Sequence, residues 1–422
     1  MRILFLVYAP NKSLTSFLEK KSTISPWVDS MLEEIVKCEQ IIAGLAIPIF
    51  DNASQKMQRD GIALYGLPDR NLVQISKQLW PRTSISNEND ELLNFTEKAI
   101  DDFKPDIIQI FGTENKFGMI QSKISIPILI HFQGSVQVVS VKWFTGITRF
   151  EQFRSSSMRN IIYRKGIYHE YFRFKEKGTR EELIIKKCKY FVGRTNFDRR
   201  LISLLSPKAK YFHCDEFIRR GFYESQWNLP LSDNISCISI LKGVTYKGID
   251  LLLETVALLT RYSAINITLK ICGVREAEEV VTILKRKHHR DTSMSRIRFL
   301  GNLGTDALIS ELYDSNFYVH PSYMENSSNS ICEAMALGMP VIATNVGGTS
   351  SLIQDGVDGL LVQEGEPYSL AAAIVELINN YDYARFLGQN AREKSKHRHN
   401  PDVLREKMIN IYQTILSEDL LS

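Results

Sequence analysis

The 422-residue chain has few of the features that mark secreted, membrane-spanning or metal-binding proteins. Its six cysteines are scattered without a Cys-x-x-Cys pair, so they predict neither a disulfide framework nor a zinc site. The sequence contains no Asp-x-Asp, and the eight histidines form no cluster, so no metal and no other cofactor is expected. An apolar run of about 18 residues is also absent, which excludes a transmembrane helix. Met1–Tyr8 is a strand too short for a signal peptide. These absences predict a cytoplasmic protein.

Composition and order indicate two globular α/β domains. Apolar residues make up 44% of the chain and charged residues 24%, and the length suffices for two cores. The net charge of +4 is weak evidence for any partner, and no nucleic-acid-binding module is recognisable. Short apolar strands alternate with helix signals, which is typical of parallel sheets. We expect a first Rossmann-like domain over 1–228, a second over 229–399, and a helix over 400–422 that packs back on the first.

The stretch from Phe317 to Val362 contains the most informative chemistry. Glu325 and Glu333 stand on either side of a strand-to-helix loop, and a run of helix-capping residues, 326–330, lies between them. Unpaired N–H groups at such a helix start favour an anion, and carboxylates beside it suit hydroxyl groups. This combination suits a nucleotide sugar. The plainer interpretation stays open: Ser330-x-x-Glu333 also matches a capping box, and Glu325 alone would be a solvated carboxylate.

The same stretch resembles the signature of glycosyltransferase family 4, the group 1, retaining enzymes of GT-B fold. The shared features are Pro-Ser, Glu-x7-Glu, Ala-Met-Ala-x-Gly-x-Pro-Val-Ile-Ala-Thr, Val-Gly-Gly and Asp-Gly-x-x-Gly-Leu-Leu-Val, found in order within 321–362. The resemblance implies that Glu325 contacts the hydroxyls of the donor sugar and Glu333 the ribose. It places the diphosphate near Ser328, Asn329, Ser330 and Ile331. One departure is that 326–328 is Asn-Ser-Ser, where many members have Gly-Phe-Gly-Leu-type residues.

Two further elements of the second half resemble donor-site elements of this family. Residues 242–248 are similar to its Gly-Arg-x4-Lys-Gly element, whose basic residues hold the donor diphosphate. Lys247 matches the lysine, and Lys242 stands at the arginine position without the bidentate guanidinium. The turn at Gly301 and Asn302 corresponds to the one beside the nucleobase. The resemblance therefore implies catalysis by Glu325, Lys247 and Lys242.

In the first half, four residues that follow predicted strands are candidates for the acceptor side or the expected cleft. These acceptor-side or cleft candidates are Glu114, Gln133, Gly134 and Arg194. Arg194 serves equally well in a structural salt bridge. His131 also ends a strand, where a hydrogen-bonded core histidine is the more frequent case.

The segment 142–189 is basic and rich in aromatic residues, with 13 Lys/Arg against 5 Asp/Glu. Basic surfaces with apolar side chains bind anionic lipid headgroups, and each basic residue contributes about 1 kcal/mol near the membrane. A polyprenyl-linked acceptor would bring the enzyme to the inner face of the plasma membrane. The alternative is a solvated pair of helices whose aromatic residues pack on the domain.

We therefore expect a metal-independent retaining glycosyltransferase (EC 2.4), which moves a sugar from a UDP- or GDP-sugar to a lipid-linked or oligosaccharide acceptor. Residues 190–198, 211–212 and 218–223 resemble a family 4 subgroup of surface-polysaccharide assembly. One alternative is a sugar-nucleotide 2-epimerase of the same fold. Another is a non-catalytic scaffold, because family members commonly have a Gly pair near the donor phosphate and this chain has none over 9–25. A glycosidase is the weakest alternative, because its two-carboxylate mechanism has no diphosphate for Lys242 and Lys247 to bind.

Overall fold

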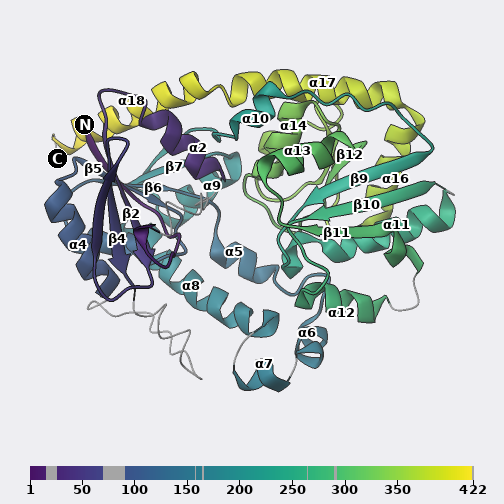
Figure 1. Cartoon of the computed structure of the whole chain (residues 1–422), viewed down its shortest axis with the longest axis horizontal. Coiled ribbons are helices and arrows are strands. Elements are labelled where there is room, and N and C mark those ends of the chain that lie inside the picture. The colour runs from purple at the N-terminus through teal and green to yellow at the C-terminus, as the bar shows by residue number, and fades with distance from the viewer. Residues whose placement is uncertain are drawn as a thin grey trace. The chain divides into compact units, whose positions relative to one another are not determined.

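The computed structural model describes residues 1–15, 26–69, 91–156, 158–163, 166–263, 265–288 and 292–420. Residues 16–25, part of the loop in which family members commonly have a Gly pair and this chain has none, lie outside the described residues. The chain divides into two compact units, drawn in Figure 1. The first comprises 1–137, 172–217 and 400–422, and the second comprises 138–171 and 218–399. None of the described helices is long and apolar enough to cross a membrane.

The first unit contains an eight-stranded sheet in the order β3-β4-β2-β1-β5-β6-β7-β8. All neighbouring strands are parallel except the edge pair of β3 and β4, which is antiparallel. This edge departs from a purely parallel sheet. The strands are β1 (Arg2–Leu6), β2 (Ile42–Ile49), β3 (Gln55–Arg59), β4 (Ile62–Pro68), β5 (Ile107–Phe111), β6 (Ile128–His131), β7 (Tyr190–Gly193) and β8 (Lys210–His213).

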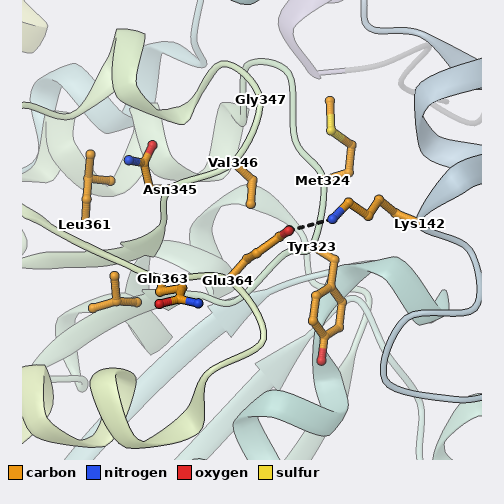
Figure 2. Close-up of a pocket in the computed structure, with 10 residues that line it drawn as sticks. Lys142, Tyr323, Met324, Asn345, Val346, Gly347, Leu361, Gln363 and Glu364 are labelled. Atoms are coloured by element: carbon orange, nitrogen blue, oxygen red, sulfur yellow. Dashed lines mark hydrogen bonds and ion pairs between the residues drawn. The ribbon is translucent and has the colours of Figure 1, made fainter.

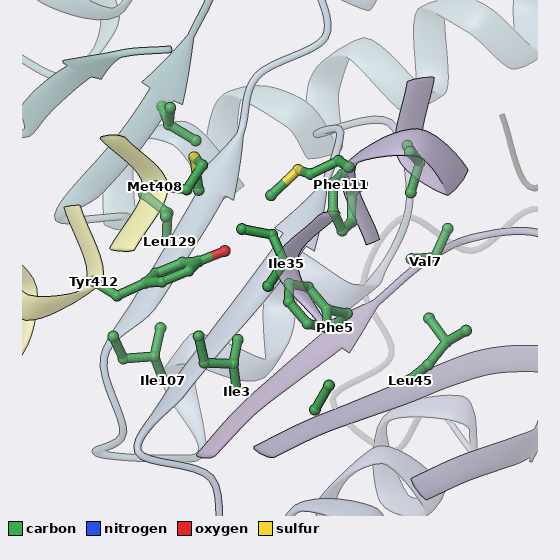
Figure 3. Close-up of a cluster of buried hydrophobic side chains, with 14 of the residues drawn as sticks. Ile3, Phe5, Val7, Ile35, Leu45, Ile107, Phe111, Leu129, Met408 and Tyr412 are labelled. Carbon is green, nitrogen blue, oxygen red and sulfur yellow. The ribbon is translucent and has the colours of Figure 1, made fainter. Parts of the chain in front are cut away.

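Alternate residues of β1 supply the two cores of this unit, one on each face of the sheet. Ile3 and Phe5 join a cluster with α2 and the last helix, whereas Leu4 and Leu6 join one with α4. Figure 3 shows the first cluster, in which Tyr412 lies over Ile3 and Ile107. The last helix thus belongs to the first unit. The helices are α2 (Pro26–Ile35), α4 (Glu91–Phe103), η1 (Phe117–Ser122), α9 (Asn196–Leu205) and α18 (Pro401–Asp419).

The second unit contains a six-stranded sheet of parallel strands in the order β11-β10-β9-β12-β13-β14. The chain order therefore reverses between β9 and β12, and open α/β sheets bind ligands at the carboxyl ends of strands at this point. The strands are β9 (Asn234–Ile240), β10 (Asn266–Cys272), β11 (Ile297–Gly301), β12 (Phe317–His320), β13 (Val341–Thr344) and β14 (Leu360–Val362).

Helices cover the second sheet (Figure 1), and a buried apolar cluster of this unit includes residues of α13 (Thr305–Tyr313), α14 (Asn329–Leu337) and α17 (Tyr381–Arg398). Two further helices, α5 (Val136–Val141) and α8 (Ile167–Lys187), contain the positions where the chain passes between units. The helices of the second unit are α6 (Arg149–Ser155), α7 (Met158–Ile162), α10 (Arg220–Glu224), η2 (Thr245–Lys247), α11 (Ile249–Tyr262), α12 (Glu279–Lys287), η3 (Thr292–Arg296), α13 (Thr305–Tyr313), α14 (Asn329–Leu337), α15 (Thr349–Leu352), α16 (Pro367–Asn379) and α17 (Tyr381–Arg398).

Segments 138–171 and 218–228 were expected in the first domain, but both belong to the second unit. Polar contacts explain the placement of 138–171. The hydroxyl of Thr245 donates to the carbonyl oxygen of Trp143. Lys142 forms an ion pair with Glu364 at 2.5 Å. Such contacts between distant parts of the chain leave no signal in local sequence patterns.

Candidate active site

The loops that follow β9 and β12 bring Lys247 and Glu325 together at the point where the strand order reverses. The Lys247 ammonium lies 2.5 Å from Oε2 of Glu325, and both side chains are mostly buried, with exposed fractions of 15% and 13%. The two residues are 78 positions apart in the chain, yet β9 and β12 are hydrogen-bonded neighbours. The structure therefore joins two of the three predicted catalytic residues.

Two glycines allow these loops to approach closely. Gly248 has φ +73°, and a Cβ there would lie 2.0 Å from the carbonyl oxygen of Pro321. Gly347 has φ +50°, and a Cβ there would lie 1.9 Å from the carbonyl oxygen of Glu325. This oxygen also accepts a hydrogen bond from the Gly348 N–H. The glycines of the Lys-Gly and Val-Gly-Gly motifs thus fix the backbone around Glu325.

The carboxylate of Glu325 is held ionised by its neighbours. Burial alone would raise its pKa, but Lys247 and His320 outweigh that effect and hold the pKa of Glu325 well below its usual range. His320 Nε2 lies 2.9 Å from Oε2 of Glu325, and the Ser322 hydroxyl lies 3.1 Å from the same nitrogen. A carboxylate that remains ionised at neutral pH can accept hydrogen bonds but cannot act as a general acid.

A chain of buried polar groups continues from His320 to the start of α14. Burial lowers the pKa of His320, so its imidazole is neutral, and the ionised Glu325 requires the proton on Nε2. On the other side of the ring, the Tyr318 hydroxyl lies 3.1 Å from Nδ1 and 2.7 Å from Oγ of Ser330. Ser328 Oγ lies a further 3.0 Å from Ser330 Oγ. The chain links the carboxylate to the helix start.

The amino end of α14 combines free backbone donors with unpartnered polar side chains. The first intrahelical bond is donated by Cys332 to Ser328, so the N–H groups of 329–331 have no partner within the helix. Oγ of Ser327 and Oδ1 of Asn329 are buried, and neither has a hydrogen-bond partner among the described residues. Such a helix end suits an anion, and its N-cap, Ser328, lies three residues after Glu325, the partner of Lys247.

Glu333 lies one turn further along α14, where Arg219 holds both of its carboxylate oxygens. Arg219 Nε donates to Oε1 and a terminal nitrogen donates to Oε2, each at 2.7 Å. The other terminal nitrogen donates to the Thr305 hydroxyl at 3.1 Å. The N-cap of α14 is Ser328, and Ser330 lies within the helix, so Glu333 does not form the capping box considered above. Each oxygen retains a lone pair for a ligand hydroxyl.

A cavity of about 530 Å³ opens at the carboxyl ends of β12, β13 and β14. Figure 2 shows Tyr323 and Met324 at this cavity, with the Lys142–Glu364 ion pair on its wall. Met324, one of the residues that line the cavity, directly precedes Glu325 in the chain. The ten lining residues are Lys142, Tyr323, Met324, Asn345, Val346, Gly347, Leu361, Val362, Gln363 and Glu364.

The remaining predicted donor-site residues lie on neighbouring loops. Lys242 follows β9 and is exposed, so its ammonium is available to solvent or to a ligand. Gly301 ends β11 with φ +65°, and Asn302 follows it with an exposed side chain. All three residues lie at the carboxyl edge of the sheet that carries Glu325.

The predicted cleft residues of the first unit follow neighbouring strands. Glu114 follows β5, and burial raises the pKa of its carboxyl. Gln133 and Gly134 follow β6 and are half-buried. Arg194 is buried, and its guanidinium lies 4.8 Å from the centre of the Trp27 ring. His131 is also buried, with its ring tilted against that of Trp27 at 4.6 Å, which matches the expected core histidine.

Three residues that organise these loops had no role predicted from the sequence. His320 and Arg219 hold the two glutamates of the motif. In the first unit, the buried Glu181 accepts hydrogen bonds from the Thr113 and Ser135 hydroxyls and from two backbone N–H groups that open α5. The only signal for His320 was its position directly before Pro-Ser.

Comparison with known proteins identifies the family. A family model described as glycosyl transferases group 1 matches residues 232–380. An uncharacterized glycosyltransferase of Methanocaldococcus jannaschii is 33% identical over 280 residues, which cover 66% of each chain. Residues 232–380 thus form a group 1 glycosyltransferase domain. The capsular polysaccharide biosynthesis glycosyltransferase CapM of Staphylococcus aureus is 26% identical over 207 residues, 46% of this chain and 50% of CapM. The matches thus cover less than two thirds of the length of these relatives.

Solved structures share the fold of this chain. Sucrose-phosphate synthase of Thermosynechococcus elongatus matches with a TM-score of 0.70 and 15% identity, over 99% of this chain and 100% of the other. The Anabaena protein HepE, solved in complex with UDP-glucose, matches with a TM-score of 0.65 and 15% identity, over 98% and 100%. At these identities the likeness establishes the fold. The predicted GT-B fold is confirmed.

Proposed function

We propose that the protein transfers a sugar, with retention of anomeric configuration, from a nucleotide-diphosphate sugar to a lipid-linked or oligosaccharide acceptor in surface-polysaccharide synthesis. The observation that carries this proposal is the Lys247–Glu325 pair beside the amino end of α14. It combines a cation, a helix start and an ionised carboxylate within one pair of loops. The cation and the helix start suit a diphosphate, and the carboxylate suits the hydroxyls of a sugar.

In the proposed reaction, the bond between the anomeric carbon and the diphosphate oxygen breaks, and the acceptor oxygen forms a bond to that carbon. The acceptor loses its hydroxyl proton, which balances the charge left on the diphosphate. Lys247 and the N–H groups of 329–331 stabilise that charge, and Lys242 adds a second ammonium from the loop after β9. These cationic groups replace a metal ion in the proposed mechanism.

The carboxylates have binding roles. Glu325 remains ionised, so it accepts hydrogen bonds from the hydroxyls of the donor sugar. Glu333, fixed by Arg219, accepts bonds from the ribose, and the nucleobase lies near Gly301 and Asn302. The acceptor contacts Glu114, Gln133, Gly134 and Arg194 of the first unit. Support for the donor class comes from HepE, solved with UDP-glucose, and support for the pathway comes from the name of CapM.

Calorimetric titration with UDP, GDP and ADP, in the presence of a chelator, tests the donor site. We expect one nucleotide to bind to the wild type, and Lys247→Ala to weaken that binding at least about tenfold, because a buried charge-assisted contact is lost. Lys270→Ala is the matched control, since Lys270 also forms a mostly buried ion pair, with Glu311, in the same unit. Absence of binding to all three nucleotides, or equal affinity in Lys247→Ala, would overturn the proposal.

A further inference from the structure

Two short helices of the second unit expose large apolar side chains to solvent. In α6, Phe150 and Phe153 are 69% and 46% exposed, and in α7, Met158 and Ile162 are 72% and 55% exposed. Spacings of three and four residues place each pair on one side of its helix. We call these four residues, with Arg149 and Arg154 of α6, the α6–α7 patch (Figure 1).

Hydrogen bonds hold the backbone of α6 and the start of α8, which follows α7. A capping box between Thr148 and Glu151 fixes the start of α6. The buried Gln152 donates to the carbonyl oxygen of Ile147 at 3.1 Å. After α7, Glu279 of α12 accepts a hydrogen bond from the Ile167 N–H at 3.0 Å. The exposed apolar side chains of α6 therefore project from a backbone that these hydrogen bonds hold.

Basic residues flank the apolar ones. The guanidinium of Arg149 lies 5.9 Å from the centre of the Tyr168 ring, and Phe153 packs edge-on to the same ring at 5.3 Å. Arg154 is exposed on the same helix. Residues 142–165 contain six Lys/Arg and one Asp/Glu. The patch thus joins aromatic and aliphatic groups to a net positive charge, the combination that anionic bilayer surfaces attract.

We propose that the α6–α7 patch inserts into the headgroup region of an anionic bilayer and holds the enzyme at the membrane surface. Phe150, Phe153, Met158 and Ile162 would be removed from water, and the arginines would contact lipid phosphates. A second copy of the chain fits less well, because face-to-face contact would bring like charges together. At the bilayer the enzyme would meet the lipid-linked acceptor of the proposed function. Only this encounter rests on that function, and the membrane contact itself does not.

The patch is narrower than the basic segment 142–189 expected from sequence. Most aromatic residues of α8 are half-buried; the rings of Phe144 and Tyr171, for example, are 4.6 Å apart. Phe172 is the exception among the aromatic residues of α8, at 40% exposed. The described structure therefore concentrates the candidate membrane contact in 149–162.

Flotation with vesicles tests the inference directly. We expect the full chain to float with vesicles of phosphatidylglycerol and phosphatidylcholine, and to bind phosphatidylcholine vesicles at least about tenfold more weakly. The double variant Phe150→Ser/Phe153→Ser and the double variant Arg149→Glu/Arg154→Glu should each lose at least about tenfold in partitioning. Phe386→Ser on α17 is the matched control, because Phe386 is 52% exposed. It should float as the wild type does.

Three outcomes would overturn this inference: no flotation of the wild type, equal flotation of the patch variants, or an equal loss in Phe386→Ser. Sedimentation that shows a wild-type dimer dissociated by Phe150→Ser/Phe153→Ser would assign the patch to a second copy instead. Nucleotide titration of the same variants separates the two proposals, because the patch contains no donor-site residue. If the wild type binds a nucleotide but does not float with the vesicles, the membrane contact is refuted and the donor site is not.

Discussion

Arg219 donates one hydrogen bond to each carboxylate oxygen of Glu333, so the second glutamate of the motif is fixed by a residue 114 positions away. The first glutamate is fixed in a similar way, by Lys247 and His320. Each acidic residue thus has a basic partner from another element of the second unit. A donor would meet carboxylates whose orientation is already set, which lowers the entropy cost of binding.

Replacing Arg219 by lysine tests this orientation. Arg219→Lys retains the charge but cannot form both bonds to Glu333, so we expect the affinity for the bound nucleotide to fall about tenfold. The adjacent Arg220→Lys is the control, because Arg220 is exposed and forms an ion pair with Glu224, one turn along α10. Calorimetric titration measures both. Equal affinity in the wild type and Arg219→Lys would mean that nucleotide binding does not depend on the two hydrogen bonds from Arg219 to Glu333.

Removal of the first glutamate should stop the reaction. In Glu325→Ala the donor sugar loses its carboxylate partner, and Lys247 becomes a mostly buried charge without its ion pair. We expect transfer to fall at least about a hundredfold while the far-ultraviolet circular dichroism stays unchanged. Glu311→Ala, which breaks the Lys270–Glu311 pair, is the control and should keep most of its activity. Near wild-type transfer by Glu325→Ala would show that Glu325 does not have its proposed role in the site.

His320 offers a sharper test because its two nitrogens have different partners. Nε2 lies 2.9 Å from Glu325, and Nδ1 lies 3.1 Å from the Tyr318 hydroxyl. A glutamine at this position can place its amide near the Nε2 site, whereas an asparagine can place its amide near the Nδ1 site. If His320 positions Glu325, His320→Gln should retain at least about tenfold more transfer activity than His320→Asn. The reverse order would show that the contact with Tyr318 matters more.

The sequence predicted the elements of the second unit well because its motif residues serve local geometry. Gly248 and Gly347 are required by close backbone approaches, and such requirements leave a recognisable pattern. The partners of the glutamates were not predicted, since Arg219 and His320 act through tertiary contacts with no fixed spacing. Segment 138–171 was placed in the first domain for the same reason. Its attachment depends on single contacts such as that of Lys142 with Glu364.

Asp250 should make stability depend on pH. It is buried, accepts a hydrogen bond from the Tyr323 hydroxyl at 2.6 Å, and burial raises its pKa to about 6. The unfolded chain loses this proton near pH 4, so the folded state binds more protons between about pH 4 and 6. The contribution is therefore complete below pH 4 and is lost as pH rises through 6. The loss is about 3 kcal/mol.

The variant Asp250→Asn removes this titration. We expect its melting temperature to change less between pH 5 and pH 7.5 than that of the wild type, measured by thermal unfolding in buffers of equal ionic strength. The control is Asp306→Asn, which makes the same change on the exposed side of α13. An identical pH dependence in the wild type and Asp250→Asn would show that Asp250 is already ionised at pH 5.

Glu181 should be essential to the stability of the first unit. Its carboxylate accepts hydrogen bonds from Ser135 Oγ at 2.8 Å and from the N–H groups of Val136 and Gln137 at 3.1 Å each, and Thr113 adds a fourth. Glutamine has one oxygen fewer and turns an NH₂ group toward donors, so Glu181→Gln should lower the free energy of unfolding by about 2 to 4 kcal/mol.

The neighbouring Glu182→Gln is the matched control for this change. Glu182 forms an exposed ion pair with Lys186 on the next turn of α8, so its loss should cost no more than about 0.5 kcal/mol. Urea unfolding of both variants measures the difference. Because Glu181 joins the loops after β5 and β6 to the start of α5, the same variant should also disturb Gln133 and Gly134, two proposed acceptor contacts. A loss of stability in Glu181→Gln no larger than in Glu182→Gln would show that the four donors find other acceptors, and that α8 does not hold these loops.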